Sequence, residues 1–168
     1  GEPAAFGPTR IVYPTFENQL RYDKRSRVVL DTDVDGEAGF VRRTRYDARG
    51  QVDATTDPAG HTTFYEYDAL GRLTQVTDRL GFAITYAYDN RDNLIAVTDP
   101  QGGVYRMVYD RTNRLTEERR PDAQASRYAY DATGNLLEVT QAGGGRIAYA
   151  YDATGRLTEA QTFAAGAG

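Results

Sequence analysis

Three aspartates at alternate positions form the pattern in this sequence that is nearest to a metal site. They are Asp31, Asp33 and Asp35, and Gly36 follows them directly. Alternating carboxylates that converge on one point suit a hard cation such as calcium, and a glycine permits the sharp turn of a calcium-binding loop. The twelfth position of such a loop, where a glutamate would bind the ion with both oxygens, is Arg42. The sequence therefore favours an acidic, solvated hairpin loop here, with a calcium site as the alternative.

Residues that could perform acid–base or nucleophilic chemistry are few and show no catalytic spacing. His61 is the one histidine of the chain, the two serines are Ser26 and Ser126, and no Gly-x-Ser-x-Gly motif occurs. A Ser-His-Asp triad is therefore unsupported, and a histidine beside a turn is expected to lie at the surface. The many aspartates recur with predicted turns, and turn capping explains such recurrence better than catalysis. We expect no enzyme and, apart from the calcium alternative, no cofactor.

Charge and composition exclude several other classes of protein. The chain has 20 basic and 24 acidic residues and a net charge of −4, and Lys24 is its single lysine. This balance argues against a strongly basic nucleic-acid binder. The absence of cysteine excludes disulfide scaffolds, thiolate zinc sites and thiol nucleophiles. No apolar run approaches the roughly 20 residues of a membrane-spanning helix, and no charged-then-apolar leader opens the sequence, so we expect no membrane span and no signal peptide in it.

The elements that position these residues follow from an internal repeat. Tyr-Asp pairs begin at seven positions, which are separated first by one interval of 24 residues and then by five intervals of 21 residues. Six residues after each tyrosine stands a valine or a leucine, beginning with Val28 and Val52. A fixed period that carries both a motif and an apolar position indicates a structural module. The signature that we expect to be structural comprises Tyr46, Asp47, Gly50, Tyr67, Asp68, Gly71, Leu73, Tyr88, Asp89, Leu94, Tyr109, Asp110, Leu115, Tyr130, Asp131, Gly134, Leu136, Tyr151, Asp152, Gly155 and Leu157.

Each repeat contains two predicted turns. Residues 68–71 read Asp-Ala-Leu-Gly, which fits a type I turn followed by a glycine in the left-handed conformation. Where this glycine is missing the residue is Asp92 or Asn113, two of the residue types that tolerate positive φ. The second turn reads Asp-Pro-x-Gly at 57–60 and 99–102, and Asp-Arg-Leu-Gly at 78–81. The chain is thus expected to reverse direction twice per repeat.

Segments of six or seven residues separate these turns and are rich in tyrosine, threonine and valine, which favours strands. We therefore predict an all-β fold, an antiparallel β-meander of about 12 strands in a curved sheet. The equivalent tyrosines are expected to form a column across the sheet. Leu73 and Val76 differ in parity, which a bulge or partial burial of both faces would explain. The predicted organisation is a lead-in over 1–19 that could be a diverged repeat, a repeat array over 20–163, and a small-residue tail over 164–168.

Two further features admit a binding role as well as a structural one. The tyrosines could stack on sugars, although a tyrosine in every repeat is better explained by packing within the sheet. Arg119 and Arg120 replace the usual Thr-Asp in the fifth aligned copy, so that its turn reads Arg-Pro-Asp-Ala at 120–123. A lone basic pair is most simply surface variation, and a docking site for an acidic partner is the alternative.

The repeat motif resembles the YD repeat of the Rhs family. The similarity rests on Tyr-Asp-x-x-Gly-Arg-Leu at 67–73 and 151–157 and on Thr-Asp-Pro-x-Gly at 56–60 and 98–102, and it covers about residues 20–163. The family includes bacterial Rhs polymorphic toxins, C components of Tc toxins, wall-associated proteins and animal teneurins. The resemblance implies many repeats that wind a long β-sheet into a hollow shell, which in bacterial members encloses a C-terminal toxic domain. The family's self-cleaving Asp-Pro-x-Gly-Leu sequence is not matched, because residues 57–61 end in His61 and residues 99–103 in Gly103.

This resemblance implies a structural function, namely a shell segment whose parent encloses and delivers a toxin in competition between bacteria. The implied partners are flanking repeats of the same polypeptide and the enclosed toxin, with self-association through sheet edges and neither nucleic acid nor a membrane span. The implied location is secreted or delivered to the cell exterior. A cell-surface adhesion or carbohydrate-binding module is the alternative, and the sequence beyond residue 168 would discriminate between the two.

Overall fold

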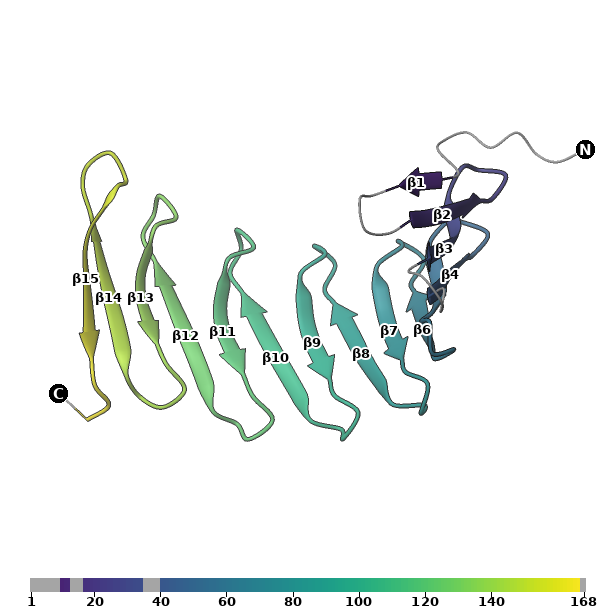
Figure 1. Cartoon of the computed structure of the whole chain (residues 1–168). Coiled ribbons are helices and arrows are strands. Elements are labelled where there is room, and N and C mark those ends of the chain that lie inside the picture. The colour runs from purple at the N-terminus through teal and green to yellow at the C-terminus, as the bar shows by residue number, and fades with distance from the viewer. Residues whose placement is uncertain (1–9, 13–16, 35–39, 167–168) are drawn as a thin grey trace, which may run out of the picture. The chain divides into compact units, whose positions relative to one another are not determined.

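The computed structural model describes residues 10–12, 17–34 and 40–166, and all the regular structure in these ranges is β (Figure 1). The chain divides into two compact units, Gly1–Ala83 and Ile84–Gly168, and each is described by itself. The first unit holds β1 (Arg10–Val12), β2 (Glu17–Tyr22), β3 (Val28–Val34), β4 (Phe40–Tyr46), β5 (Val52–Thr56), β6 (Thr62–Tyr67) and β7 (Leu73–Thr77). The second holds β8 (Ala83–Tyr88), apart from its first residue, and β9 (Leu94–Thr98), β10 (Val104–Tyr109), β11 (Leu115–Arg119), β12 (Ala125–Tyr130), β13 (Leu136–Thr140), β14 (Arg146–Tyr151) and β15 (Leu157–Phe163).

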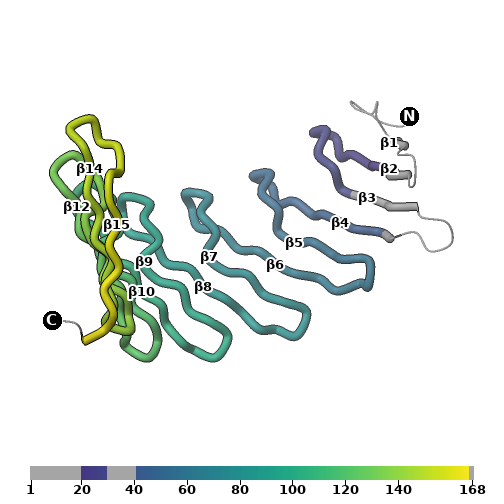
Figure 2. Tube along the Cα trace, turned by 60° about the vertical axis from the view of Figure 1, so that its left-hand side comes forward, coloured from purple at the N-terminus to yellow at the C-terminus, as the bar shows by residue number. Residues whose placement is uncertain are grey.

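Within each unit every strand pairs antiparallel with the strands next to it in the sequence, which is the predicted meander. The successive hairpins of the second unit can be followed from β8 to β15 in Figure 1 and along the tube in Figure 2. Fifteen strands are described, three more than expected. The three additional strands are β1, β2 and β3, which precede the twelve strands β4 to β15, and β1 lies within the predicted lead-in.

A β-bulge precedes the repeat tyrosine in every Tyr-Asp hairpin. In the β6–β7 pair, Glu66 lies opposite Gln75 but Tyr67 lies opposite Leu73, so Thr74 is the extra residue. The same shift occurs before Tyr22, Tyr46, Tyr88, Tyr109, Tyr130 and Tyr151. An extra residue reverses the alternation of side chains along a strand, so the bulge explains the unequal parity of Leu73 and Val76. Of the two explanations that the sequence offered, the bulge is therefore confirmed.

The described strands of each unit form a single sheet, so these residues have no layered hydrophobic core. Among the described residues one hydrophobic side chain, Ala54, is buried, with 5% of its surface exposed. Stabilising contacts run instead between neighbouring strands, where Tyr86 and Tyr105 both lie opposite Val97, and Tyr128 lies opposite Val139. Aromatic and β-branched pairs of this kind each contribute about 0.2–1 kcal/mol. The sheet therefore depends on its tyrosines and turns more than on buried aliphatic side chains.

Candidate functional site

The turn after each repeat tyrosine has the predicted geometry. In the turn that begins at Asp68, the Gly71 N–H donates to the Asp68 carbonyl at 3.1 Å, and the Asp68 N–H donates to the Arg72 carbonyl at 2.9 Å. Gly71 has a φ of +87°, a conformation that costs an L-residue about 1–2 kcal/mol. This is a three-residue loop, a type I turn closed by a left-handed residue, so the prediction is confirmed.

The aspartate carboxylate fastens this turn from inside. Asp68 Oδ1 accepts the Leu70 N–H at 2.9 Å and the Arg72 N–H at 3.0 Å, and Oδ2 accepts Arg72 Nε at 2.7 Å. In all seven Tyr-Asp turns the aspartate accepts the backbone N–H four residues later. Because these donors favour the charged form, the pKa of Asp68 is lowered, first of all by the Arg72 N–H. The recurring aspartates are thus capping groups, as predicted.

The same cause lowers the pKa of other aspartates in this row. Hydrogen bonds from the Arg27 side chain lower the pKa of Asp23 to about 2, and those from the Thr154 hydroxyl, with the Arg156 N–H, lower that of Asp152 to about 2. The pKa of Asp131 is also lowered, chiefly by the Thr133 hydroxyl. These carboxylates are therefore charged throughout the neutral range, which suits a structural role better than proton transfer.

Non-glycine residues occupy the left-handed position in four turns. Asp92 and Asn113 have φ of 66° and 62°, which confirms the prediction made for them. Ser26 and Ala123 have φ of 60° and 66° and were not predicted. The repeat alignment could have identified both positions, because each is the fourth residue of an aligned turn. Serine and alanine, however, are not typical of the left-handed conformation.

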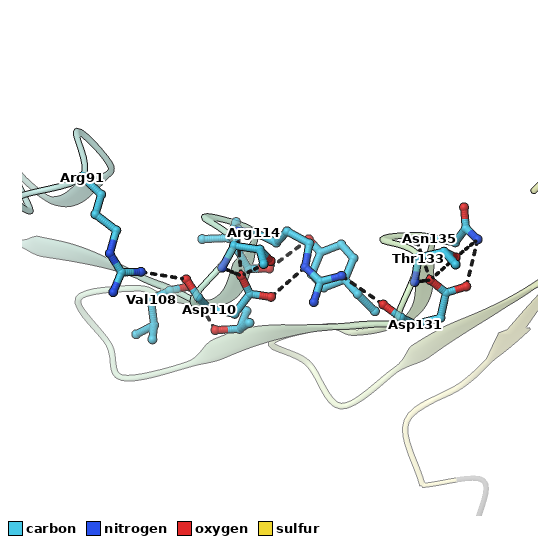
Figure 3. Close-up of polar contacts among 11 residues, drawn as sticks. Arg91, Val108, Asp110, Arg114, Asp131, Thr133 and Asn135 are labelled. Carbon is cyan, nitrogen blue, oxygen red and sulfur yellow. Dashed lines mark hydrogen bonds and ion pairs between the residues drawn. The ribbon is translucent and has the colours of Figure 1, made fainter.

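Side chains link several of the Tyr-Asp turns to the next one along the sheet. Arg114 donates through Nη1 to the Asp131 carbonyl at 3.0 Å, and Arg91 does the same to the Asp110 carbonyl at 3.4 Å (Figure 3). In the first unit, Gln51 Nε2 donates to the Gly71 carbonyl at 2.8 Å. Since each donor lies one repeat before its acceptor, the turns form a bonded row along one edge of the strands.

The repeat tyrosines provide a second link between repeats. The Tyr130 hydroxyl donates to the Leu115 carbonyl at 2.9 Å, and the Tyr109 hydroxyl donates to the Leu94 carbonyl at 3.0 Å. Equivalent bonds join Tyr46 to Val28, Tyr67 to Val52 and Tyr151 to Leu136, each at 2.9 Å. Burial of the ring raises the pKa of Tyr109, which keeps its hydroxyl protonated as a donor. The leucine and valine of the signature thus act through their backbone, a role that the sequence did not predict.

The tyrosine hydroxyl compensates for a local loss of strand pairing. Strands β5 and β6 pair from Thr56 with Thr62 to Ala54 with Phe64 and no further towards the Tyr-Asp end. Val52 begins β5 and Tyr67 ends β6, so the hydroxyl reaches the neighbouring strand where the backbone ladder has stopped. The tyrosine is therefore a clamp at the splayed end of this pair, and Tyr130 clamps the β11–β12 pair in the same way, because that ladder stops at Glu117 with Arg127.

The structure describes two of the three candidate calcium residues. Asp31 and Asp33 lie in strand β3, where they pair with Arg42 and Phe40 of β4, so this stretch is strand and not the loop that we expected. Asp35 lies outside the described residues. No group of three or more acidic or histidine side chains that could hold a metal occurs in the described part of the chain. The calcium alternative therefore stays a prediction.

The remaining candidate groups lie in separate turns and strands. His61 is exposed and its Nδ1 lies 3.0 Å from Asp57 Oδ2, within one turn. Ser26 lies in the first Tyr-Asp turn, whereas Ser126 lies in β12 of the other unit. Arg119 is exposed and paired with Glu117 at 2.7 Å. No helix in the described ranges has the length and apolarity needed to cross a membrane.

Comparison with known families and structures agrees with the repeat. The model of the Teneurin YD-shell family matches residues 8–165. No protein with a curated description matches the chain in sequence. A crystal structure of TcdB2-TccC3 without its hypervariable C-terminal region superposes with a TM-score of 0.76 at 18% identity, over 90% of this chain and 9% of that one. A crystal structure of TcdB2-TccC3-Cdc42 superposes with a TM-score of 0.74 at 18% identity, over 90% of this chain and 9% of that one.

A Tc holotoxin pore of Photorhabdus luminescens with a mutated TccC3 gives a TM-score of 0.68 at 16% identity, over 92% of this chain and 11% of that one. At these identities the likeness concerns the fold. The chain spans about a tenth of the length of the chains that it matches.

Proposed function

Because the chain belongs to the Teneurin YD-shell family, we propose that it is a structural segment of a shell wall whose parent encloses and delivers a toxic polypeptide in competition between bacteria. The role is structural and not catalytic. Its partners are flanking repeats of the same polypeptide and the enclosed toxin, and its place of action is outside the producing cell.

The observation that supports a wall most directly is the double link between successive repeats. Five repeat tyrosines, Tyr46, Tyr67, Tyr109, Tyr130 and Tyr151, donate their hydroxyl to the strand before them, and several turns donate a side chain to the turn after them. These links repeat with the 21-residue period and need no core, so the sheet can lengthen by addition of identical units. A wall of any length can be built in this way.

Flanking repeats would join at the sheet edges. In the described structure β15 pairs with β14 on one side, and its other side offers backbone groups to a further strand. Leu157 in β15 is 55% exposed, more than expected for a signature leucine between two strands. We propose that such edges accept a neighbouring repeat in the parent and cause self-association of the 168-residue chain by itself.

Limited proteolysis of the intact parent tests the wall role. Tyr128, Ala129 and Tyr130 are replaced together by glycine, which removes a tyrosine clamp and two cross-strand side chains. The enclosed polypeptide should then be digested faster than in the unaltered parent. A matched control replaces Ala69 and Leu70, which are exposed in a turn, by glycine and should leave protection intact. Cargo that is equally digestible in all three proteins would refute the proposal.

A further inference from the structure

Strand β5 is the floor of a trough on one face of the first unit. Ala54 lies opposite Arg45 of β4 on one side and opposite Phe64 of β6 on the other. A small residue between two long ones leaves a depression, and a groove of about 570 Å³ lies over it. Phe64 is 43% exposed although it borders this groove. At this end of the trough, the exposed ring of Phe64 therefore lies beside the small side chain of Ala54 at the base.

The other end of the trough is cationic. Arg43 lies opposite Thr56 and lines the same groove. The Arg43 side chain is exposed and has no hydrogen bond or ion pair with any residue in the described ranges. Arg45, by contrast, bonds Asp53 through Nε at 2.8 Å. Arg43 is thus the uncompensated charge of the trough.

The acidic residue that lines the groove, Asp23, is already engaged. Asp23 Oδ2 accepts Arg27 Nε at 2.7 Å, so Asp23 and Arg27 neutralise each other. The trough therefore keeps a positive charge in a chain whose net charge is −4. This local excess favours a ligand that brings one carboxylate.

The repeat itself does not require these side chains. The positions one period after Arg43 and Arg45 hold Phe64 and Glu66, and no other repeat has arginine at both positions. The arginine pair and the aromatic wall are therefore features of this place in the array and not of the fold in general.

We propose that the trough binds an extended segment of the enclosed polypeptide in which an acidic residue and an apolar residue stand two positions apart. This inference rests on the proposed wall function. Arg43 and Arg45 are two residues apart on one strand, about 6.8 Å, and residues i and i+2 of an extended peptide have the same separation on one face. The carboxylate pairs with Arg43 while the apolar side chain packs over Ala54 against Phe64.

Fluorescence anisotropy with a defined peptide tests the proposal on the 168-residue chain. The probe is fluorescein-labelled Gly-Ser-Glu-Gly-Leu-Ser-Gly. One control peptide has glutamine in place of glutamate, and another has glutamate and leucine adjacent, which places them on opposite faces of an extended chain. The probe should bind in a salt-sensitive manner, and both controls should bind about tenfold more weakly, the factor that corresponds to 1.4 kcal/mol.

Variants of the protein locate the site. Arg43→Gln should weaken binding of the probe about tenfold. Ala54→Leu, which fills the floor, should also weaken it. Arg111→Gln removes the same charge from an exposed turn of the second unit and should change nothing. Circular dichroism of each variant must match the wild-type spectrum, so that loss of binding reflects the site; if Ala54→Leu fails this criterion, Arg43→Gln decides.

Several results would overturn the proposal. These are no binding of the probe, equal binding of the peptide with adjacent residues, and equal weakening by Arg111→Gln. Self-association that Arg43→Gln abolishes would assign the trough to a second copy of the chain instead. The wall function fails separately: if the glycine replacement in β12 exposes the cargo of the parent but the probe does not bind, only the trough proposal is wrong.

Discussion

Removal of one tyrosine hydroxyl measures what the clamp contributes. Tyr130→Phe deletes the donor to the Leu115 carbonyl, a bond of 2.9 Å, and keeps the ring under the Arg114 guanidinium, which lies 4.8 Å from the ring centre. A single hydrogen bond of this kind contributes about 1 kcal/mol to the free energy of unfolding. For a chain of this size that corresponds to a fall of about 2–4 °C in Tm.

Thermal and urea unfolding followed by circular dichroism provide the assay, and Tyr105→Phe provides the matched control. Tyr105 is 37% exposed, and its hydroxyl has no hydrogen bond partner among the described residues. The same chemical change there should alter the free energy of unfolding by no more than about 0.5 kcal/mol. Tyr109→Phe and Tyr130→Phe act on separate strand pairs, so together they should cost about 2 kcal/mol.

The destabilisation should also be local. In a repeat protein each unit contacts its neighbours alone, so loss of the Tyr130 clamp acts on β11 and β12 first. Amide hydrogen exchange in these strands should accelerate about fivefold, as 1 kcal/mol implies, while β14 changes less. Equal stability changes for Tyr130→Phe and Tyr105→Phe, or no change for either, would refute the clamp.

Three further predictions concern the turns and the acidic segment. Ala123→Gly should raise the free energy of unfolding by about 1 kcal/mol, because the alanine is held at a φ of 66°. Gly134→Ala should lower the free energy of unfolding, because it places a side chain at a φ of +100°. Urea melts in which both variants change the stability in the same direction would contradict this prediction. The urea midpoint of unfolding should fall as the pH drops from about 4 towards 2, because Asp23 and Asp152 have pKa values of about 2 in the folded state against about 3.9 in the unfolded state. Their contribution to the free energy of unfolding is therefore present above pH 4 and is lost below it. Asp152→Asn should flatten this pH profile, and an unchanged profile would count against the capping role. Calcium should leave Tm unchanged, because Asp31 and Asp33 lie in strand β3 and not in a loop. If a site existed, calcium at 100 times its Kd would add about 2.7 kcal/mol to the free energy of unfolding. A calcium-dependent rise in Tm that Asp33→Ala abolishes would establish the calcium alternative.

Features that depend on neighbouring residues alone could be predicted from the order of the amino acids. The turn at Asp68 is closed by bonds that reach no further than Arg72, so five consecutive residues carry its whole signal. The same holds for the left-handed conformation of Asp92 and Asn113. The 21-residue period then predicted a meander, because short strands joined by tight turns can pair only with their sequence neighbours. The bulge was foreseen as one explanation of the changed parity at Leu73.

The contacts that a side chain makes across the sheet could not be predicted in this way. The acceptor of the Tyr130 hydroxyl is the Leu115 carbonyl, 15 residues earlier, and a backbone carbonyl has no mark in the sequence. The trough likewise exists because the register sets Ala54 between Arg45 and Phe64, residues from three strands. A shift of one residue would turn these side chains to opposite faces, so strand register, which long-range pairing fixes, decides both the clamp and the trough.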